Sequence, residues 1–193
     1  GRFKHYMLKE IFDQPLAIKE SLINFTNYEK RTINLPKTEI NFENIQNIHL
    51  TACGTAYHAC MIAKYWFEEI TNTQTSVDIA SEYRYRKCTL NINSLGIVVS
   101  QSGETMDSLE SLKKYLLKKI KTASIVNVLK SSIARKSDYV LPTIAGPEIG
   151  VASTKAFTNQ LLVLALLSLH IKNEKRMNVS DNNLLQSLFL LSD

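Results

Sequence analysis

Three hydroxyl side chains are crowded into the six residues SQSGET, from Ser100 to Thr105. They follow the apolar run LGIVV and precede a stretch with helical periodicity, which predicts a turn between a strand and a helix. The hydroxyls can donate hydrogen bonds, Gly103 lets the backbone approach a ligand closely, and free N–H groups at a helix start favour an anion. The segment therefore has the chemistry of a phosphate-binding turn.

Two other turns are also rich in small and hydroxyl residues. ACGTA covers positions 52–56, and GPEIGVAST covers positions 146–154. If the strands before ACGTA and SQSGET are neighbours in an open parallel sheet, the two turns face each other across the crevice where such sheets bind ligands. We therefore expect one binding surface built from three turns.

Each hydroxyl also has a structural alternative. A serine or threonine before a helix commonly caps it, and Ser102, Thr105 and Ser153 all stand in such positions. Ser102 and Thr105 have the spacing of a capping pair, but threonine replaces the Glu or Gln that a reciprocal capping box needs. Anion binding and helix capping both stay open at this point.

Other kinds of site have weaker support. The chain lacks a P-loop sequence, and its first turn has one glycine where a dinucleotide fingerprint has three, so Asp78 is a weak candidate for binding a ribose. Cys53 and His58 could form a nucleophilic pair, but a cysteine at a strand end is more often a small buried residue. The histidines show no metal-ligand spacing, and we predict neither a metal site nor a cofactor.

The scaffold that positions these turns is predicted to be α/β. After Pro36, short apolar runs alternate with amphipathic stretches, which indicates βαβ units and a five-stranded parallel sheet sandwiched by helices, in the flavodoxin-like order 2-1-3-4-5. The predicted strands are Ile48–Ala52, Ser76–Ala80, Leu95–Ser100, Thr122–Val128 and Asp138–Leu141.

Three helices are predicted to follow the three turns. The last begins at about Ser153 and is apolar nearly all round from Leu161 to Leu169, so we expect a missing segment or a second subunit, as in a homodimer, to cover it. The first, from about Thr55, is predicted to bury Ala59, Ala63, Phe67 and Ile70. The second is predicted to bury Met106, Leu109, Leu112, Leu116 and Ile120.

The chain of 193 residues suits one domain with an appended element. The segment Arg2–Asn27 has a helical pattern with Pro15 in the position of a first helical residue. We assign residues 1–35 to an N-terminal helical arm and linker, and residues 36–193 to the main module. The chain starts without Met and ends in an apolar run, so we expect it to be a piece of a longer protein.

Composition argues against several classes of protein. The net charge is only +5, and the basic stretch Lys113–Lys121 is interrupted by apolar residues at helical spacing, so we predict no nucleic-acid partner. The charged N-terminus does not resemble a signal peptide, and LLVLALLSL is too short to span a bilayer, so we predict no membrane association. Three cysteines without a CxxC pair fit a reducing cytoplasm.

Five segments in order resemble the isomerase part of the glutamine:fructose-6-phosphate aminotransferases, also called glucosamine-6-phosphate synthases. The match runs from about His5 to Leu169, and that isomerase part consists of two sugar-isomerase (SIS) modules, of which this chain resembles the first with its helical arm. The segments are HYMLKEIFDQP, ACGTAYHA, ASEYRYR, SQSGETMDSL and GPEIGVASTKAFTNQLL.

The resemblance implies a phosphosugar ligand, either fructose 6-phosphate or glucosamine 6-phosphate. It also implies a part in making glucosamine 6-phosphate from fructose 6-phosphate and glutamine. The residues that it implies for the phosphate are Ser100, Gln101, Ser102 and Thr105. Those that it implies for the sugar are Cys53, Gly54, Thr55, Val151 and Ser153.

The chain departs from the family pattern in ways that limit the expected chemistry. Its first turn has Ala56 where the family commonly has serine, so one hydroxyl contact is lost. The glutaminase domain with its catalytic cysteine is missing, and so are the second SIS module and the C-terminal tail. The resemblance assigns the family's imine-forming lysine and proton-transfer groups to the second module and the tail. We therefore predict no catalytic residue here. Lys155 and Glu148 are the only nearby candidates, and we favour structural roles for both.

A non-catalytic sugar-phosphate sensor built on the same module is the alternative function. A sensor of this kind usually carries a DNA-binding or partner-binding segment, and the N-terminal arm shows no helix-turn-helix pattern. The arm itself resembles the synthase, which favours the enzyme.

Overall fold

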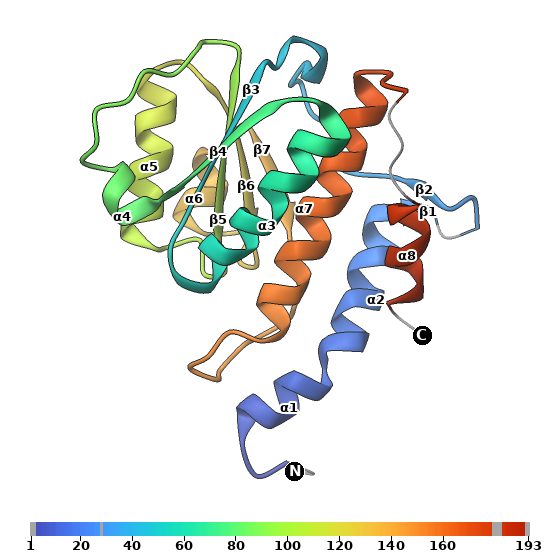
Figure 1. Ribbon diagram of the computed structural model, residues 1–193. Coiled ribbons are helices and arrows are strands. Elements are labelled where there is room, and N and C mark those ends of the chain that lie inside the picture. The colour runs from blue at the N-terminus through green and yellow to red at the C-terminus, as the bar shows by residue number, and fades with distance from the viewer. Residues whose placement is uncertain (1–2, 28, 179–182, 192–193) are drawn as a thin grey trace.

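A five-stranded parallel sheet lies at the centre of the computed structural model, which describes residues 3–27, 29–178 and 183–191. Its strand order is β4-β3-β5-β6-β7, which confirms the predicted parallel sheet and its 2-1-3-4-5 order (Figure 1). Each strand begins and ends within two residues of its predicted position. The strands are β3 (Asn47–Ala52), β4 (Gln74–Ile79), β5 (Ser94–Ser100), β6 (Lys121–Val126) and β7 (Tyr139–Pro142).

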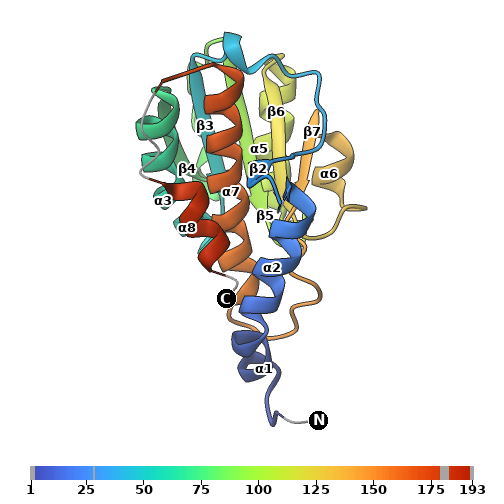
Figure 2. The same cartoon turned by 90° about the vertical axis from the view of Figure 1, so that its right-hand side faces the viewer.

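Helices cover both faces of this sheet. Helices α3 and α7 lie on one face with α2 beside α7, and α5 and α6 lie on the other (Figures 1 and 2). A short antiparallel pair of strands, β1 (Thr26–Asn27) and β2 (Thr32–Ile33), and a 3-10 turn η1 (Phe42–Asn44) connect the arm to the sheet. The helices are α1 (Tyr6–Phe12), α2 (Gln14–Phe25), α3 (Gly54–Thr71), α4 (Ala80–Tyr83), α5 (Met106–Leu117), α6 (Ser132–Lys136), α7 (Lys155–Glu174) and α8 (Leu184–Leu190).

Helix α7 is covered within this chain, so the expectation that it needs an external partner was wrong. Residues 162–169 are all buried. Helix α3 packs on one side of α7 and the arm helix α2 on the other, while the sheet lies beneath (Figure 2). The prediction failed because the sequence pattern does not show that the arm folds back onto this helix.

The N-terminal arm is two helices rather than one helical segment. The first helix ends at Phe12, and the second has Pro15 in its first turn, as predicted. Proline cannot continue a preceding helix because it lacks an N–H group and its ring clashes with the previous turn. Leu22 and Phe25 of α2 join the main hydrophobic core. Arg2, at the start of the predicted helical segment, lies outside the described residues, and the boundary after residue 35 remains a prediction.

Helix α3 buries Ala59, Ala63, Phe67 and Ile70, as predicted, whereas the buried face of α5 differs from its prediction. Met106 is exposed, and Ile120 is buried beyond the end of the helix. The buried face includes Tyr115, whose ring fits over Gly96 of β5 so closely that a Cβ at position 96 would lie 2.6 Å from it. The buried residues of α5 are Ser108, Ser111, Leu112 and Tyr115.

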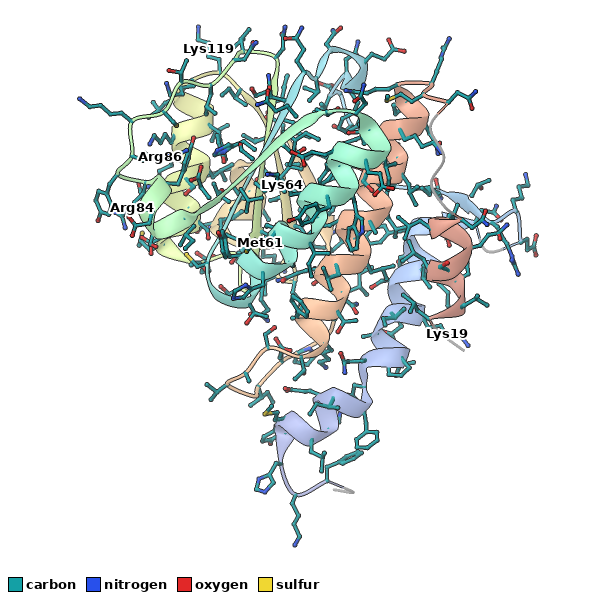
Figure 3. The ribbon with its side chains drawn as sticks, viewed as in Figure 1. Lys19, Met61, Lys64, Arg84, Arg86 and Lys119 are labelled. Atoms are coloured by element: carbon teal, nitrogen blue, oxygen red, sulfur yellow. The ribbon has the colours of Figure 1, made fainter. Side chains whose placement is uncertain are left out.

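None of the helices within the described ranges is both long and apolar enough to cross a membrane. Exposed side chains project from the outer surfaces of the helices, and Met61 and Lys64 on α3 illustrate this (Figure 3). Lys64 and Glu68 form an exposed ion pair at 3.8 Å along the same helix.

Candidate functional site

A pocket of ≈190 Å³ lies where β3 and β5 end side by side. The register pairs Ala52 with Val99, so the turns that follow the two strands leave the same edge of the sheet as neighbours. This confirms that ACGTA and SQSGET meet at the carboxyl ends of the strands. The residues lining the pocket are Cys53, Thr55, Ala56, Val99, Ser100, Gln101, Ser102, Thr105, Ser153 and Gln160.

The SQSGET turn is held by hydrogen bonds between its own residues. The hydroxyl oxygens of Ser100 and Thr105 lie 3.0 Å apart, and the Gly103 N–H donates to Ser100 Oγ at 3.0 Å. Gly103 has a φ of +65°, and a Cβ at this position would lie 2.0 Å from Ser131 Oγ. Only glycine fits here, because both the backbone conformation and the space exclude a side chain.

The same turn is also attached to the start of α6 and to the residue that follows β6. Glu104 accepts a hydrogen bond from the Ser132 N–H at the start of α6, at 2.7 Å, and this bond lowers the pKa of the Glu104 carboxyl below its usual value. The backbone oxygen of Gln101 accepts from the Asn127 N–H at 3.0 Å. The turn is therefore a preordered structure, and its pocket-lining hydroxyls are held in place.

Helix capping does not account for these hydroxyls. The residues before α3 and α5 are Cys53 and Thr105, and neither side chain makes a capping hydrogen bond. Ser102 accepts a hydrogen bond from the Glu104 N–H at 3.1 Å, within the turn. Helices α3 and α5 thus begin at the pocket without side-chain caps, an arrangement that favours an anion at the first-turn N–H groups.

The third turn contributes to the pocket through Ser153, which confirms that all three turns reach one place. Val151 from the same turn is fully exposed and lies outside the lining set. Gly54, the first residue of α3, has a φ of +57° and also lies outside that set. The other residues expected to bind the ligand all line the pocket.

Gln160 is a pocket residue that the sequence prediction missed. It lies in the second turn of α7, its side chain is 1% exposed, and its Oε1 has no hydrogen-bond partner among the described residues. A buried amide oxygen without a partner is unfavourable unless a ligand or a water donates to it. A glutamine just before an apolar run was the only sequence signal available.

Lys155 and Glu148 are engaged in structural contacts. The Glu148 carboxylate accepts hydrogen bonds from the N–H groups of Thr154, at 2.8 Å, and Ala156, at 3.3 Å, where α7 begins. Lys155 is buried, and its Nζ lies 3.6 Å from a carboxylate oxygen of Asp13 in the arm. Neither residue lines the pocket.

The other candidate groups do not form a site with the pocket. His58 is exposed, and its ring packs edge-on against Tyr57 with the ring centres 5.8 Å apart, while Cys53 lines the pocket. Asp78 accepts hydrogen bonds from His49, at 2.9 Å, and from Arg86, at 2.7 Å, so its carboxylate is already paired. Across the described ranges, His, Cys, Asp and Glu residues nowhere gather in a group that could hold a metal ion.

The fold and its strand-end pocket place this chain in a known class. The family model of the SIS domain matches residues 41–169, and the chain belongs to the SIS domain family. Over 169 residues it is 49% identical to the isomerising glutamine–fructose-6-phosphate aminotransferase of Brucella abortus biovar 1 (strain 9-941), a match that covers 88% of this chain and 28% of that protein.

Two further comparisons extend this similarity over nearly the whole chain. The chain is 46% identical over 191 residues to the same aminotransferase of Bradyrhizobium diazoefficiens (strain JCM 10833 and equivalents), covering 97% of this chain and 31% of that protein. It superposes on the C-terminal domain of glucosamine-fructose-6-phosphate aminotransferase from Francisella tularensis with a TM-score of 0.90 and 43% identity, covering 98% of this chain and 53% of that chain. The predicted resemblance is confirmed, and the chain spans less than a third of the aminotransferase sequences it matches.

Proposed function

We propose that this chain is the first SIS module of an isomerising glutamine–fructose-6-phosphate aminotransferase, and that its pocket binds fructose 6-phosphate or glucosamine 6-phosphate. The observation that carries the proposal is the preordered SQSGET turn, whose three hydroxyls line a pocket between the starts of α3 and α5. The similarity to aminotransferases across both the arm and the module supports the same function.

In this proposal the phosphate lies on the side of the pocket formed by Ser100, Gln101, Ser102 and Thr105. Hydroxyl and backbone N–H donors form charge-assisted hydrogen bonds with a phosphate, and the N-termini of α3 and α5 favour its negative charge. The sugar then extends toward Cys53, Thr55 and Ser153, which also line the pocket.

Three residues on the sugar side of the pocket, Gly54, Val151 and Ala56, have no side-chain hydroxyl to offer the ligand. We propose that Gly54 contributes through its backbone, because it is the first residue of α3 and carries no side chain. Val151 is proposed to contact the ligand from the exposed third turn. Ala56 lines the pocket with a methyl group and therefore provides no hydroxyl contact.

We further propose that this chain binds the sugar but does not convert it. Moving a proton between the first two sugar carbons needs a general base within about 3 Å of that proton. Lys155 and Glu148 do not line the pocket, and both are already engaged: Lys155 pairs with Asp13, and the Glu148 carboxylate accepts from the Ser153 hydroxyl at 3.4 Å and from the N–H groups where α7 begins. The second SIS module and the C-terminal tail of the whole enzyme are proposed to supply this missing proton transfer.

The test of this proposal is the double substitution Ser102→Ala with Thr105→Ala. Calorimetric titration with fructose 6-phosphate should show binding to the unsubstituted chain and at least a tenfold loss in the variant, because each charge-assisted hydrogen bond contributes about 1.5–3 kcal/mol. Thr32→Ala with Ser187→Ala, two exposed positions outside the pocket, is the matched control. Unchanged affinity in a folded double variant would remove this turn from the site.

A separate assay tests the proposal that this chain binds the sugar while other parts of the enzyme convert it. The purified chain, incubated with fructose 6-phosphate and ammonia, should form neither glucosamine 6-phosphate nor glucose 6-phosphate, while the complete reading frame supplied with glutamine should form glucosamine 6-phosphate. Turnover by the chain alone would contradict the proposed division. The sensor alternative is not favoured, because the similarity to the aminotransferases includes the arm.

We also propose that the protein forms a homodimer in the cytoplasm. Its three cysteines are all free, which fits a reducing compartment. Exposed apolar side chains on the arm, including Tyr6, Phe12 and Leu16, provide an apolar surface for association.

A further inference from the structure

Glu10 is a buried carboxylate on an otherwise exposed helix. Its side chain is 3% exposed, whereas the other residues of α1 are exposed to solvent. Burying a charged carboxylate is unfavourable unless hydrogen bonds compensate for the lost hydration. The position of Glu10 therefore depends on the groups that donate to it.

Those donors belong to the third turn of the candidate site. Glu10 Oε1 accepts hydrogen bonds from the N–H of Ile149, at 2.6 Å, and from the N–H of Gly150, at 3.2 Å. The second oxygen, Oε2, lies at the same distance of 3.2 Å from the Gly150 nitrogen. The carboxylate thus holds two successive backbone groups, 139 and 140 positions further along the chain.

The arm and this turn are also in close steric contact. A Cβ built at Gly150 would lie 2.6 Å from Glu10 Oε2 and 3.3 Å from the Met7 Cα, so a side chain at this position would displace the Glu10 carboxylate. In the ribbon, the segment between β7 and α7 reaches toward α1 at the end of the molecule where the arm begins (Figure 1).

Two other arm residues contact the beginning of α7. Asp13 pairs with Lys155 at 3.6 Å, and the Thr158 hydroxyl donates to the side-chain oxygen of Gln14. The arm therefore contacts the third turn at two places: at Ile149 and Gly150, in the middle of the turn, and at the start of α7, which follows the turn. Ser153, which lines the pocket, lies between these two attachment points.

We propose that Glu10 is a positioning residue that holds residues 149–153 in the conformation that binds the sugar, so that the N-terminal arm completes the binding site. This inference rests on the proposed function. A turn that is already ordered loses less conformational entropy when a ligand binds. Without the Glu10 carboxylate, the turn would become ordered only on binding, and the entropy lost would weaken the affinity for the sugar.

The experiment compares Glu10→Ala with the unsubstituted full chain in two titrations. The affinity for fructose 6-phosphate should fall about tenfold, which corresponds to ordering roughly one backbone residue on binding. The affinity for inorganic phosphate should not change, because the SQSGET turn that is proposed to bind it has no contact with Glu10. Glu10→Gln keeps one acceptor oxygen and should lose less affinity for the sugar. Glu20→Ala, an exposed carboxylate on α2, is the control.

Hydrogen exchange of the peptide spanning residues 144–154 provides a readout that is independent of the ligand. In Glu10→Ala the amides of Ile149 and Gly150 should exchange faster, while those of the sheet should not. Unchanged exchange, unchanged sugar affinity, or an equal loss of sugar and phosphate affinity would each overturn the positioning role.

If Glu10→Ala does not fold, Glu10→Gln decides the question, and wild-type affinity and exchange in that variant would overturn the role. Failure of the unsubstituted chain to bind fructose 6-phosphate would instead overturn the proposed function, and with it the part of Glu10 in binding.

Discussion

At the scale of single residues, Gln160 has an amide oxygen with no hydrogen-bond partner among the residues that the structure describes. A group of this kind lowers stability, because water solvates the same oxygen in the unfolded chain. Gln160 lines the pocket, and a sugar bound there has several hydroxyl groups that could donate a hydrogen bond to its Oε1. Ligand binding would therefore explain why this position has a glutamine. Such opposition between stability and binding is common where a site is preorganised for its ligand.

Replacing Gln160 with methionine should therefore change stability and binding in opposite directions. Methionine keeps the length of the side chain and removes the unpaired oxygen, so the free energy of unfolding should stay the same or rise. The affinity for fructose 6-phosphate should fall by about two- to tenfold, the value of one neutral hydrogen bond. Thermal unfolding and calorimetric titration measure the two effects, and Gln186→Met on the exposed surface of α8 is the control. A variant that binds as well as the unsubstituted chain would exclude the contact.

At the scale of elements, β3, β4 and α5 are joined by a polar network away from the pocket. His49 of β3 is buried, and its two ring nitrogens contact the Tyr115 hydroxyl of α5 and the Asp78 carboxylate of β4. Arg86 pairs with the same carboxylate at 2.7 Å. Burial lowers the pKa of His49, and the nearby charges of Arg86 and Lys114 lower it further, so the pKa lies below its ordinary value although the Asp78 carboxylate raises it.

This network predicts how stability depends on pH. The pKa of His49 is lower in the folded protein than its ordinary value of about 6.5, so the unfolded chain binds more protons. The stability contributed by neutral His49 is complete above about pH 6.5 and is lost as the pH falls toward the lower folded value. Burial also lowers the pKa of His170, which adds to the same slope. Urea unfolding between pH 7.5 and 5.5 should show decreasing stability.

The His49→Gln variant tests the assignment of this slope. It should lose part of the decrease in stability between pH 7.5 and 5.5, and the remaining part should come from His170. His58→Gln, which changes an exposed histidine outside this network, is the control. An unchanged slope in His49→Gln would mean that this histidine keeps an ordinary pKa in the folded protein.

At the scale of the whole molecule, the arm exposes several large apolar side chains, whereas the apolar run of α7 is buried. We predict a concentration-dependent dimer in sedimentation velocity, because Leu16 and Ile23 of α2 expose 59% and 57% of their surface. The double substitution Leu16→Ser with Ile23→Ser should shift the chain toward monomer. Leu117→Ser, on the exposed end of α5, should not. Sedimentation of the unsubstituted chain as a monomer at high concentration would contradict this use of the arm.

Much of this fold could be predicted because local patterns determine it. Strand β5 is buried at every position, and its continuous apolar run LGIVV has the composition expected of a central parallel strand. The hydroxyls at 100, 102 and 105 and the glycine at 103 identified the turn, since few other residues suit both its backbone and an anion. Parallel topology then placed the turns after β3 and β5 together, because the carboxyl ends of neighbouring strands share one edge.

Only the tertiary structure determined which distant groups meet. Glu10 and Gly150 are 140 positions apart, and no local periodicity in either segment predicts their contact. The burial of Gln160 beside the pocket likewise depends on how α7 packs. The apolar surface of α7 is covered in part by the arm, and the sequence pattern gives no sign that the arm folds back onto this helix. A residue's type and spacing determine which hydrogen bonds it can make, whereas the packing of elements far apart in the chain determines which of those bonds form.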